Sequence, residues 1–339
     1  MQNIKAFCTS KTCKLFQETC SHLGIEPCYL NKVQFANGEL SIRFSESVRN
    51  LPVVLFVQQT QQINTDLMEL LLAINAAKGA GASTIIVVWP CSPYARQNQS
   101  NTNLLPTSSF IGNLMAYAGV LNWITVDLHE PVLPNKALRI HNLSAHNLLL
   151  ERFKELYPTK ENWICVAADE GAIKRTRSFA NALAIPFGFC RKIRENNQVK
   201  ILELVGDVAQ KSVLLIDDMI DSGKTLQAAS TYLHQNGARN IVCAVTHGIT
   251  RQEVFSKLAV SPLDGLIETD TLPILESGFD KDLNIVSVAP LLDVHTTPFL
   301  NSSVTFRLGK RLHQQAPSLR TWFRFLCQTR YRPTKGHSQ

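Results

Sequence analysis

The sequence contains no long hydrophobic run. Its longest apolar stretches, such as residues 53–57 and 85–89, fall far short of the roughly 20 residues that cross a bilayer. The first sixteen residues are polar and interrupted by lysines, and they lack the continuous apolar segment of a secretory signal. We therefore expect a cytoplasmic protein that does not associate with membranes.

Carboxylates are absent from residues 305–339, which hold eight Lys or Arg side chains. The rest of the chain carries 26 basic and 27 acidic side chains, so the formal net charge of +7 arises almost entirely at the basic end. A neutral body with a basic tail is typical of a solvated segment or of a contact for an acidic partner. We expect no nucleic-acid binding.

No two cysteines have the C-x-x-C spacing of zinc or redox sites, and the total of nine is odd. Cys165 and Cys243 lie inside apolar, strand-like runs. This pattern indicates buried free thiols in a reducing compartment.

Short β-rich runs alternate with helical patterns along the chain. Near-continuous apolar strands that alternate with helices predict an α/β fold, in which helices cover both faces of a parallel sheet. We expect strands at 52–58, 84–89, 123–128, 163–169, 212–218 and 241–246, and helices at 66–78, 108–118, 146–157 and 225–235.

A weak internal repeat relates residues 53–89 to residues 212–248, since each reads strand, loop, helix, Gly-Ala and strand. At roughly 150 residues per domain, the length of 339 residues also favours two domains. We predict domains at 1–146 and 147–304, followed by a basic tail at 305–339.

The most informative segment is 213–226, where an apolar strand ends in Asp217 and Asp218 and a polar loop then opens a helix. Ligands bind at the carboxyl ends of such strands, and the amides of a helix N-terminus bind anions. The sequence therefore predicts a sugar-phosphate site. The loop, Asp221-Ser222-Gly223-Lys224-Thr225, would hold the phosphate, while the two aspartates would bind vicinal hydroxyls.

Two other interpretations of this loop exist. A Walker P-loop requires glycine where Asp218 stands, so we reject it. Alternatively, Asp221 or Ser222 only caps a helix, and the paired aspartates are turn residues that bind no ligand.

Two further pairs carry potential chemistry. His129 and Asp169 each follow a predicted strand and would reach the same sheet edge, where a divalent metal is one possibility and a structural histidine the other. Lys192 and Arg194 stand two residues apart, so in an extended segment both would point toward a phosphate chain. From the residues alone, a surface hairpin with solvated charges explains this second pair better.

Taken together, these segments resemble the ribose-phosphate diphosphokinase family. The loop at 217–225 resembles the phosphoribosyl diphosphate motif that this family shares with type I phosphoribosyltransferases. Over residues 1 to about 295, further segments resemble the family in its order: Phe35–Glu39, Asn64–Leu70, Tyr94–Gln97, Asp127–His129, Gly206–Val208 and Thr246–Gly248.

The resemblance implies two similar type I phosphoribosyltransferase-like domains, an ATP side followed by a ribose 5-phosphate side. It implies diphosphoryl transfer from ATP to the 1-hydroxyl of ribose 5-phosphate, with Mg²⁺ as cofactor and a homo-oligomer, dimer or hexamer, as the assembly. It also implies roles for individual residues: catalysis by Lys192 and Arg194; ATP binding by Phe35, Asn37, Glu39, Arg96, Gln97 and His129; ribose 5-phosphate binding by Asp217, Asp218, Asp221, Ser222, Gly223, Lys224 and Thr225; and metal binding by His129 and Asp169.

The sequence also departs from the family pattern. Asn98, Gln99 and Ser100 replace an aspartate and basic residues, and Lys224 replaces a glycine. Loss of positive charge beside the ATP phosphates would weaken nucleotide binding. Two alternatives therefore stay open: a type I phosphoribosyltransferase, and a non-catalytic regulatory homologue of the synthetase.

Overall fold

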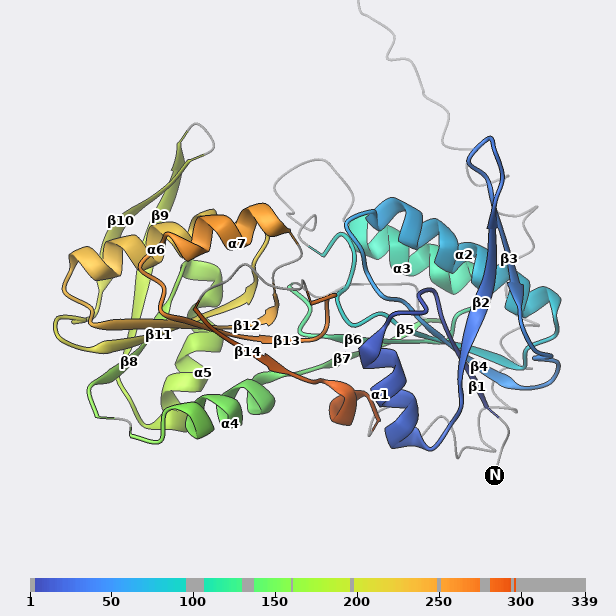
Figure 1. Ribbon diagram of the computed structural model, residues 1–339, viewed down its shortest axis with the longest axis horizontal. Coiled ribbons are helices and arrows are strands. Elements are labelled where there is room, and N and C mark those ends of the chain that lie inside the picture. The colour runs from blue at the N-terminus through green and yellow to red at the C-terminus, as the bar shows by residue number, and fades with distance from the viewer. Residues whose placement is uncertain are drawn as a thin grey trace, which may run out of the picture. The chain divides into compact units, whose positions relative to one another are not determined.

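The computed structural model describes residues 4–95, 107–129, 137–159, 161–195, 198–248, 251–274, 281–293 and 296, with side chains except at 192–202. In these ranges the chain forms two seven-stranded sheets with helices on both faces (Figure 1). The predicted α/β fold is therefore confirmed. No helix in the described ranges has the length and apolar character needed to cross a membrane.

The first sheet has the strand order β3-β2-β1-β4-β5-β6-β7. All its pairs are parallel except β2 with β3, which form an antiparallel hairpin. The strands are β1 (Lys5–Cys8), β2 (Pro27–Gln34), β3 (Leu40–Phe44), β4 (Pro52–Phe56), β5 (Thr84–Val88), β6 (Asn122–Val126) and β7 (Arg139–Leu143).

The second sheet repeats this arrangement in the order β10-β9-β8-β11-β12-β13-β14, with β9 and β10 as its antiparallel hairpin. Its strands are β8 (Trp163–Ala167), β9 (Phe187–Glu195), β10 (Gln198–Val205), β11 (Ser212–Met219), β12 (Asn240–His247), β13 (Gly265–Thr269) and β14 (Asp282–Val286). Both sheets thus follow one topology, as the internal repeat predicted.

The helices pack on the sheets through the apolar positions of their sequences. In the first half, they are α1 (Lys14–Leu23), α2 (Ile63–Gly79) and α3 (Thr107–Ala118). In the second half, they are α4 (His146–Leu156), the short 3-10 helix η1 (Glu170–Ala172), α5 (Ile173–Leu183), α6 (Lys224–Gln235) and α7 (Gln252–Ala259). All six predicted strands and all four predicted helices are present, with ends shifted by a few residues.

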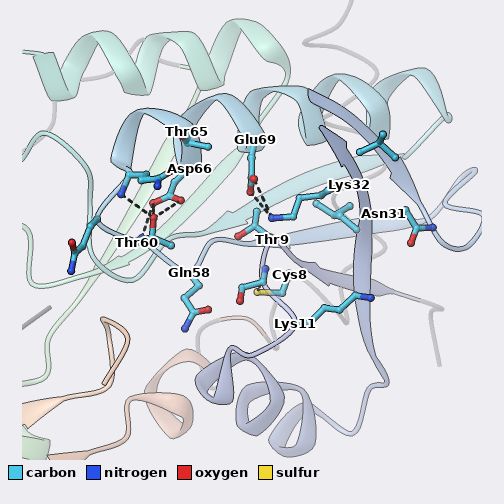
Figure 2. A pocket seen from close by; sticks show the side chains of 15 residues that line it. Cys8, Thr9, Lys11, Asn31, Lys32, Gln58, Thr60, Thr65, Asp66 and Glu69 are labelled. Atoms are coloured by element: carbon cyan, nitrogen blue, oxygen red, sulfur yellow. Dashed lines mark hydrogen bonds and ion pairs between the residues drawn. The ribbon is translucent and has the colours of Figure 1, made fainter. Parts of the chain in front are cut away.

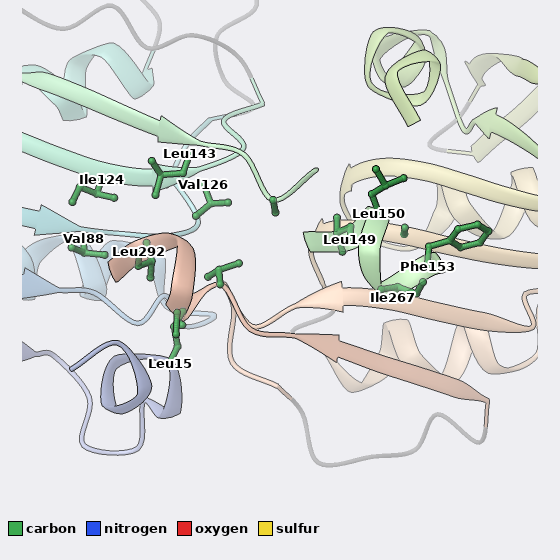
Figure 3. Close-up of a cluster of buried hydrophobic side chains, with 14 of the residues drawn as sticks. Leu15, Val88, Ile124, Val126, Leu143, Leu149, Leu150, Phe153, Ile267 and Leu292 are labelled. Atoms are coloured by element: carbon green, nitrogen blue, oxygen red, sulfur yellow. The ribbon is translucent and has the colours of Figure 1, made fainter. Parts of the chain in front are cut away.

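One continuous apolar core joins the two halves. It contains Ile124 and Leu143 of the first sheet as well as Leu150 and Ile267 of the second half (Figure 3). The chain after β14 returns to the first half, where Leu292 lies in the same cluster beside Val88. Because burial of apolar side chains drives folding, this shared core fastens the two sheets together.

Eight cysteines fall in the described ranges, and all eight are buried thiols outside any disulfide. The ninth, Cys327, lies outside these ranges, as does the whole basic tail at 305–339.

Phe153 provides a test of the shared core. Its ring is fully buried in α4 and meets the Trp163 ring edge to face at 4.9 Å between centroids. We expect Phe153→Ala to lower the free energy of unfolding by about 3–5 kcal/mol, because it leaves a cavity. Chemical denaturation measures this loss. Phe110→Ala, which truncates a phenylalanine that is 56% exposed in α3, should change the same quantity by no more than about 0.5 kcal/mol. Equal effects of the two substitutions would contradict this account of the core.

Candidate active site

The predicted phosphate loop lies at the carboxyl end of β11. Asp217 and Asp218 lie just before the last residue of the strand, Met219, and α6 begins at Lys224. Gly223 has φ +71°, and a Cβ there would lie 2.9 Å from Cγ1 of Val254, so a side chain would be both strained and crowded. Glycine at this position allows the chain to turn sharply from the strand into the helix.

The loop is held by a contact that the sequence did not suggest. Arg251, just before α7, donates from Nη2 to the carboxylate and to the backbone oxygen of Asp221, both at 2.8 Å. A guanidinium therefore stands at the loop, where it adds positive charge beside the exposed Lys224.

His129 comes from the other half of the molecule. Its Nδ1 forms a hydrogen bond with Oδ2 of Asp218, which is 8% exposed. The contact joins a residue assigned to the ATP side with one assigned to the sugar side. The carboxyl ends of both sheets therefore meet at one location.

A buried polar cluster around Asp127, two residues before His129, holds these sheet edges together. Its carboxylate accepts hydrogen bonds from the hydroxyl of Thr246 at 2.7 Å and from the amide of Ala145 at 3.1 Å. Arg175 of α5 lies 3.3 Å from the same carboxylate oxygen. Because Thr246 and Arg175 belong to the second half, Asp127 is bonded directly across the two halves.

His247, at the end of β12, adds a second connection. Its Nε2 lies 3.1 Å from the backbone oxygen of Val126, and its Nδ1 lies 2.9 Å from the hydroxyl of Thr271. Burial lowers the pKa of His247, which favours the neutral imidazole with one donor and one acceptor nitrogen. The end of β6, from which the chain leads to His129, is therefore held to the second half through Asp127 and through Val126.

The surroundings of the two carboxyl groups of β11 shift their pKa values in opposite directions. Burial, followed by the negative charges of Asp218 and Asp169, raises the pKa of Asp217. Burial also acts to raise the pKa of Asp218, but the hydrogen bond and charge of His129 outweigh it and hold that pKa below its usual range. At neutral pH the raised pKa favours protonated Asp217 in the ligand-free protein while Asp218 is ionised, so the pair carries one negative charge where the substrate hydroxyls or a cation would bind.

These carboxylates suit Mg²⁺ in chemical type. Mg²⁺ binds oxygen, keeps several of its waters, and is often held by one or two carboxylates together with substrate phosphates. Within the ranges that the structure describes, no group of three or more His, Cys, Asp or Glu is arranged to hold a metal by itself. Asp169 caps η1 by accepting from the amide of Ala172 at 3.3 Å.

Other predicted site residues lie elsewhere or outside the described ranges. Phe35, Asn37 and Glu39 form the exposed tip of the β2–β3 hairpin, where their described hydrogen bonds stay within the turn. Lys192 and Arg194 lie in β9, with their backbones paired to Ile201 and Val199 of β10. Their side chains lie outside the described set, as do Arg96, Gln97 and residues 98–100 entirely.

Sequence reasoning gave no role to four residues of this site. Asp127 and Thr246 belong to segments that carried the family resemblance, and their position next to strand ends was the available signal. Arg175 and Arg251 stand in unremarkable helical surroundings. Only the packing of distant segments brings them to the site.

Comparisons with known proteins agree with this geometry. A family model described as the N-terminal domain of ribose phosphate pyrophosphokinase matches residues 4–119, and one described as a phosphoribosyl synthetase-associated domain matches residues 192–288.

Individual relatives match most of the chain. The ribose-phosphate pyrophosphokinase of Mycobacterium tuberculosis is 34% identical over 311 residues, which are 90% of this chain and 95% of the relative. That of Aquifex aeolicus is 32% identical over 295 residues, with coverages of 86% and 94%. A crystal structure of phosphoribosylpyrophosphate synthetase from Mycobacterium smegmatis superposes with a TM-score of 0.81 at 29% identity, covering 89% of this chain and 100% of that one.

Asp217 should reduce the stability of the ligand-free protein above neutral pH. Because its pKa is raised in the folded state, its stabilising contribution is present at acidic pH and is lost as the pH rises through the folded-state pKa. We expect Asp217→Asn, which can still accept the 2.8 Å bond from the amide of Asp218, to raise the free energy of unfolding by at least about 1 kcal/mol at pH 9. The difference should shrink toward pH 4.

Asp207→Asn serves as the matched control for Asp217→Asn. Lys211 lowers the pKa of Asp207 through a hydrogen bond, so this exposed variant should gain nothing at high pH. A gain at Asp207, or none at Asp217, would show that the burial of Asp217 is not the cause.

Arg175 should be required for the stability of the cluster around Asp127. Arg175→Met leaves the Asp127 carboxylate without its cation, and we expect the free energy of unfolding to fall by about 1.5–3 kcal/mol in urea titrations. Lys174→Met, an exposed substitution one residue earlier in α5, should have an effect below about 0.5 kcal/mol. Similar losses in both variants would assign the effect to the helix and not to the ion pair.

Proposed function

Because the chain belongs to the ribose-phosphate pyrophosphokinase family, we propose that it transfers the diphosphoryl group of ATP to the 1-hydroxyl of ribose 5-phosphate. The products are phosphoribosyl diphosphate and AMP. The contact between His129 and Asp218 carries this proposal, because it joins the predicted ATP residue and the predicted sugar residue at one location.

The sugar phosphate binds at the carboxyl end of β11. The first amides of α6, with Ser222 and Thr225, hold the 5-phosphate, since an anion is stabilised at a helix N-terminus. Lys224 and the neighbouring Arg251 add positive charge. Asp217 and Asp218 accept hydrogen bonds from the ribose hydroxyls, which orients the 1-hydroxyl toward the nucleotide.

The nucleotide binds through residues of the first half. Arg96, Gln97 and His129 hold the phosphates of ATP, while Phe35 stacks on adenine with Asn37 and Glu39 as polar partners. Phe35 is 53% exposed at a hairpin tip, and this supports a homo-oligomer in which the tip serves the site of a neighbouring copy.

The 1-hydroxyl oxygen attacks the β-phosphorus and its proton is released to the solvent. The bond from that phosphorus to the oxygen that bridges it to the α-phosphorus breaks, and AMP leaves with that oxygen. Lys192 and Arg194 stabilise the negative charge that develops on the transferred group and on the leaving oxygen. His129 and Asp169 would hold Mg²⁺, which would supply positive charge to the substrate phosphates. The buried free cysteines fit a reducing, cytoplasmic compartment.

An assay for AMP formation tests the proposal. AMP should appear from ATP only when ribose 5-phosphate and Mg²⁺ are both present. A preparation that binds both substrates without forming AMP would instead be the non-catalytic homologue.

Lys192 tests the assigned chemistry within the active protein. If its ammonium acts mainly on the transition state, Lys192→Ala should lower the turnover number by about two orders of magnitude or more, with little change in either KM. Lys200→Ala, which removes a lysine from the other strand of the same hairpin, should retain turnover within a few-fold. Activity of the Lys192 variant in that same range would refute its catalytic role.

A further inference from the structure

The loop between β11 and α6 is held from outside the strand and the helix that it connects. Nη2 of Arg251 donates to the carboxylate and to the backbone oxygen of Asp221, each at 2.8 Å. Arg251 is the residue before α7, and its backbone oxygen accepts from the amide of Val254 at 3.0 Å. The start of α7 therefore fixes the backbone from which the Arg251 side chain reaches the loop.

Helix α7 makes a second contact with the same loop. A Cβ at Gly223 would meet Cγ1 of Val254 at 2.9 Å and Cγ of Leu258 at 3.6 Å, so the backbone of Gly223 lies directly against these two side chains. Gly223 is the residue immediately before α6. Since Arg251 holds the loop at Asp221, α7 supports it at two points.

The equivalent loop of the first half, between β4 and α2, is held in a different way. Asp66 in the first turn of α2 accepts from the amide of Thr60 at 2.6 Å and from its hydroxyl at 3.0 Å (Figure 2). That support comes from the helix into which the loop leads. The first turn of α6 holds no acidic residue, and the side chain that supports its loop comes from beside α7. Because an acidic group in that turn would repel an anion, this arrangement leaves the first amides of α6 to a phosphate.

The ion pair between Arg251 and Asp221 is exposed to solvent, which limits its contribution to the stability of the fold. The two side chains are 37% and 56% exposed, respectively. Exposed pairs add little to the free energy of unfolding, because water screens their charges. The effect of this pair is therefore local. It restricts the loop to one arrangement, and it neutralises a carboxylate that stands next to Ser222 in the phosphate loop.

We propose that Arg251 is a positioning residue for the sugar phosphate, which acts through Asp221 and does not contact the ligand. The role rests on the proposed function, because it concerns the same sugar-phosphate site. Arg251 keeps the loop in the arrangement that binds the phosphate. When the fraction of molecules in a binding-competent arrangement falls, the apparent affinity falls in the same proportion. Arg251 also reduces the repulsion between the Asp221 carboxylate and the incoming phosphate.

Steady-state kinetics of three variants test this role. Arg251→Gln should raise the KM for ribose 5-phosphate by about tenfold, while the turnover number and the KM for ATP change by less than about threefold. Arg251→Lys should bring the KM back to within about threefold of the unaltered protein, because one nitrogen makes both contacts and an ammonium can replace it. Lys257→Gln removes a charge from the last turn of α7 and should change none of these constants. An unchanged KM in Arg251→Gln, or equal increases in Arg251→Gln and Lys257→Gln, would overturn the proposal.

A double-mutant cycle with Asp221→Asn tests whether Arg251 acts through Asp221. If it does, adding Arg251→Gln to Asp221→Asn should raise the KM for ribose 5-phosphate by less than about threefold, because the carboxylate that Arg251 neutralises is already gone. A further tenfold rise in that background would mean that Arg251 contacts the phosphate itself, and it would overturn the proposal. The urea midpoint of Arg251→Gln should equal that of the unaltered protein. A large fall in that midpoint would assign the effect to the fold and would also overturn the proposal.

Hydrogen exchange of the full chain, measured by mass spectrometry with ribose 5-phosphate alone, separates this proposal from the proposed function. The ligand should slow exchange at residues 219–226 of the unaltered protein, and Arg251→Gln should need about ten times more ligand for the same protection. Protection at equal concentrations in both proteins would overturn the role of Arg251 and leave the proposed function standing. If residues 219–226 of the unaltered protein gain no protection, the proposed function loses its sugar site, and the role of Arg251 is overturned with it.

Discussion

The buried Asp127 carboxylate is the interaction on which the arrangement of this molecule depends. It accepts from Thr246 and pairs with Arg175, both of which belong to the second half, while Ala145 binds it within the first. A buried carboxylate is costly without such partners, so removal of a partner from the folded protein would be destabilising. His129 follows two residues later. Its contact with Asp218 therefore depends on how firmly Asp127 is held.

Buried acidic groups also lie close together at the carboxyl end of β11. Asp217 lies against Asp218 and near Asp169, an arrangement that opposes folding at neutral pH and is offset elsewhere by the continuous apolar core. A pair of carboxyl groups whose pKa values are shifted in opposite directions is typical of a functional site. The first half keeps the same topology but places glutamines there, and positive charge at Lys11 follows the adjacent strand. The two copies of one fold thus differ in the charge that follows the equivalent strands.

The sequence predicted the fold class and the local structure around residues 217–225 well, because both depend on local pattern, while the binding of a sugar phosphate by this loop stays a prediction. Apolar runs located the central strands, and the residues from Asp217 to Thr225 form a strand end, a loop and a helix start as expected. The pairing of His129 with Asp218 was not predicted, since these residues stand 89 positions apart. Arg175 and Arg251 were missed for the same reason: their function depends on tertiary packing, which has no local pattern. The domain boundary near residue 146 remains a prediction, as do the roles of Lys192 and Arg194.

The central claim is that the two sheet edges form one site for diphosphoryl transfer, and the fate of the β-phosphorus tests it most directly. ATP labelled with ³²P at the β-position should be incubated with the protein, ribose 5-phosphate and Mg²⁺. The account predicts that the label leaves with the sugar as phosphoribosyl diphosphate, while the AMP formed carries none. Label recovered in ADP would mean that only the γ-phosphoryl group moved, and label that stays in ATP would mean that no transfer occurs; either result would contradict it.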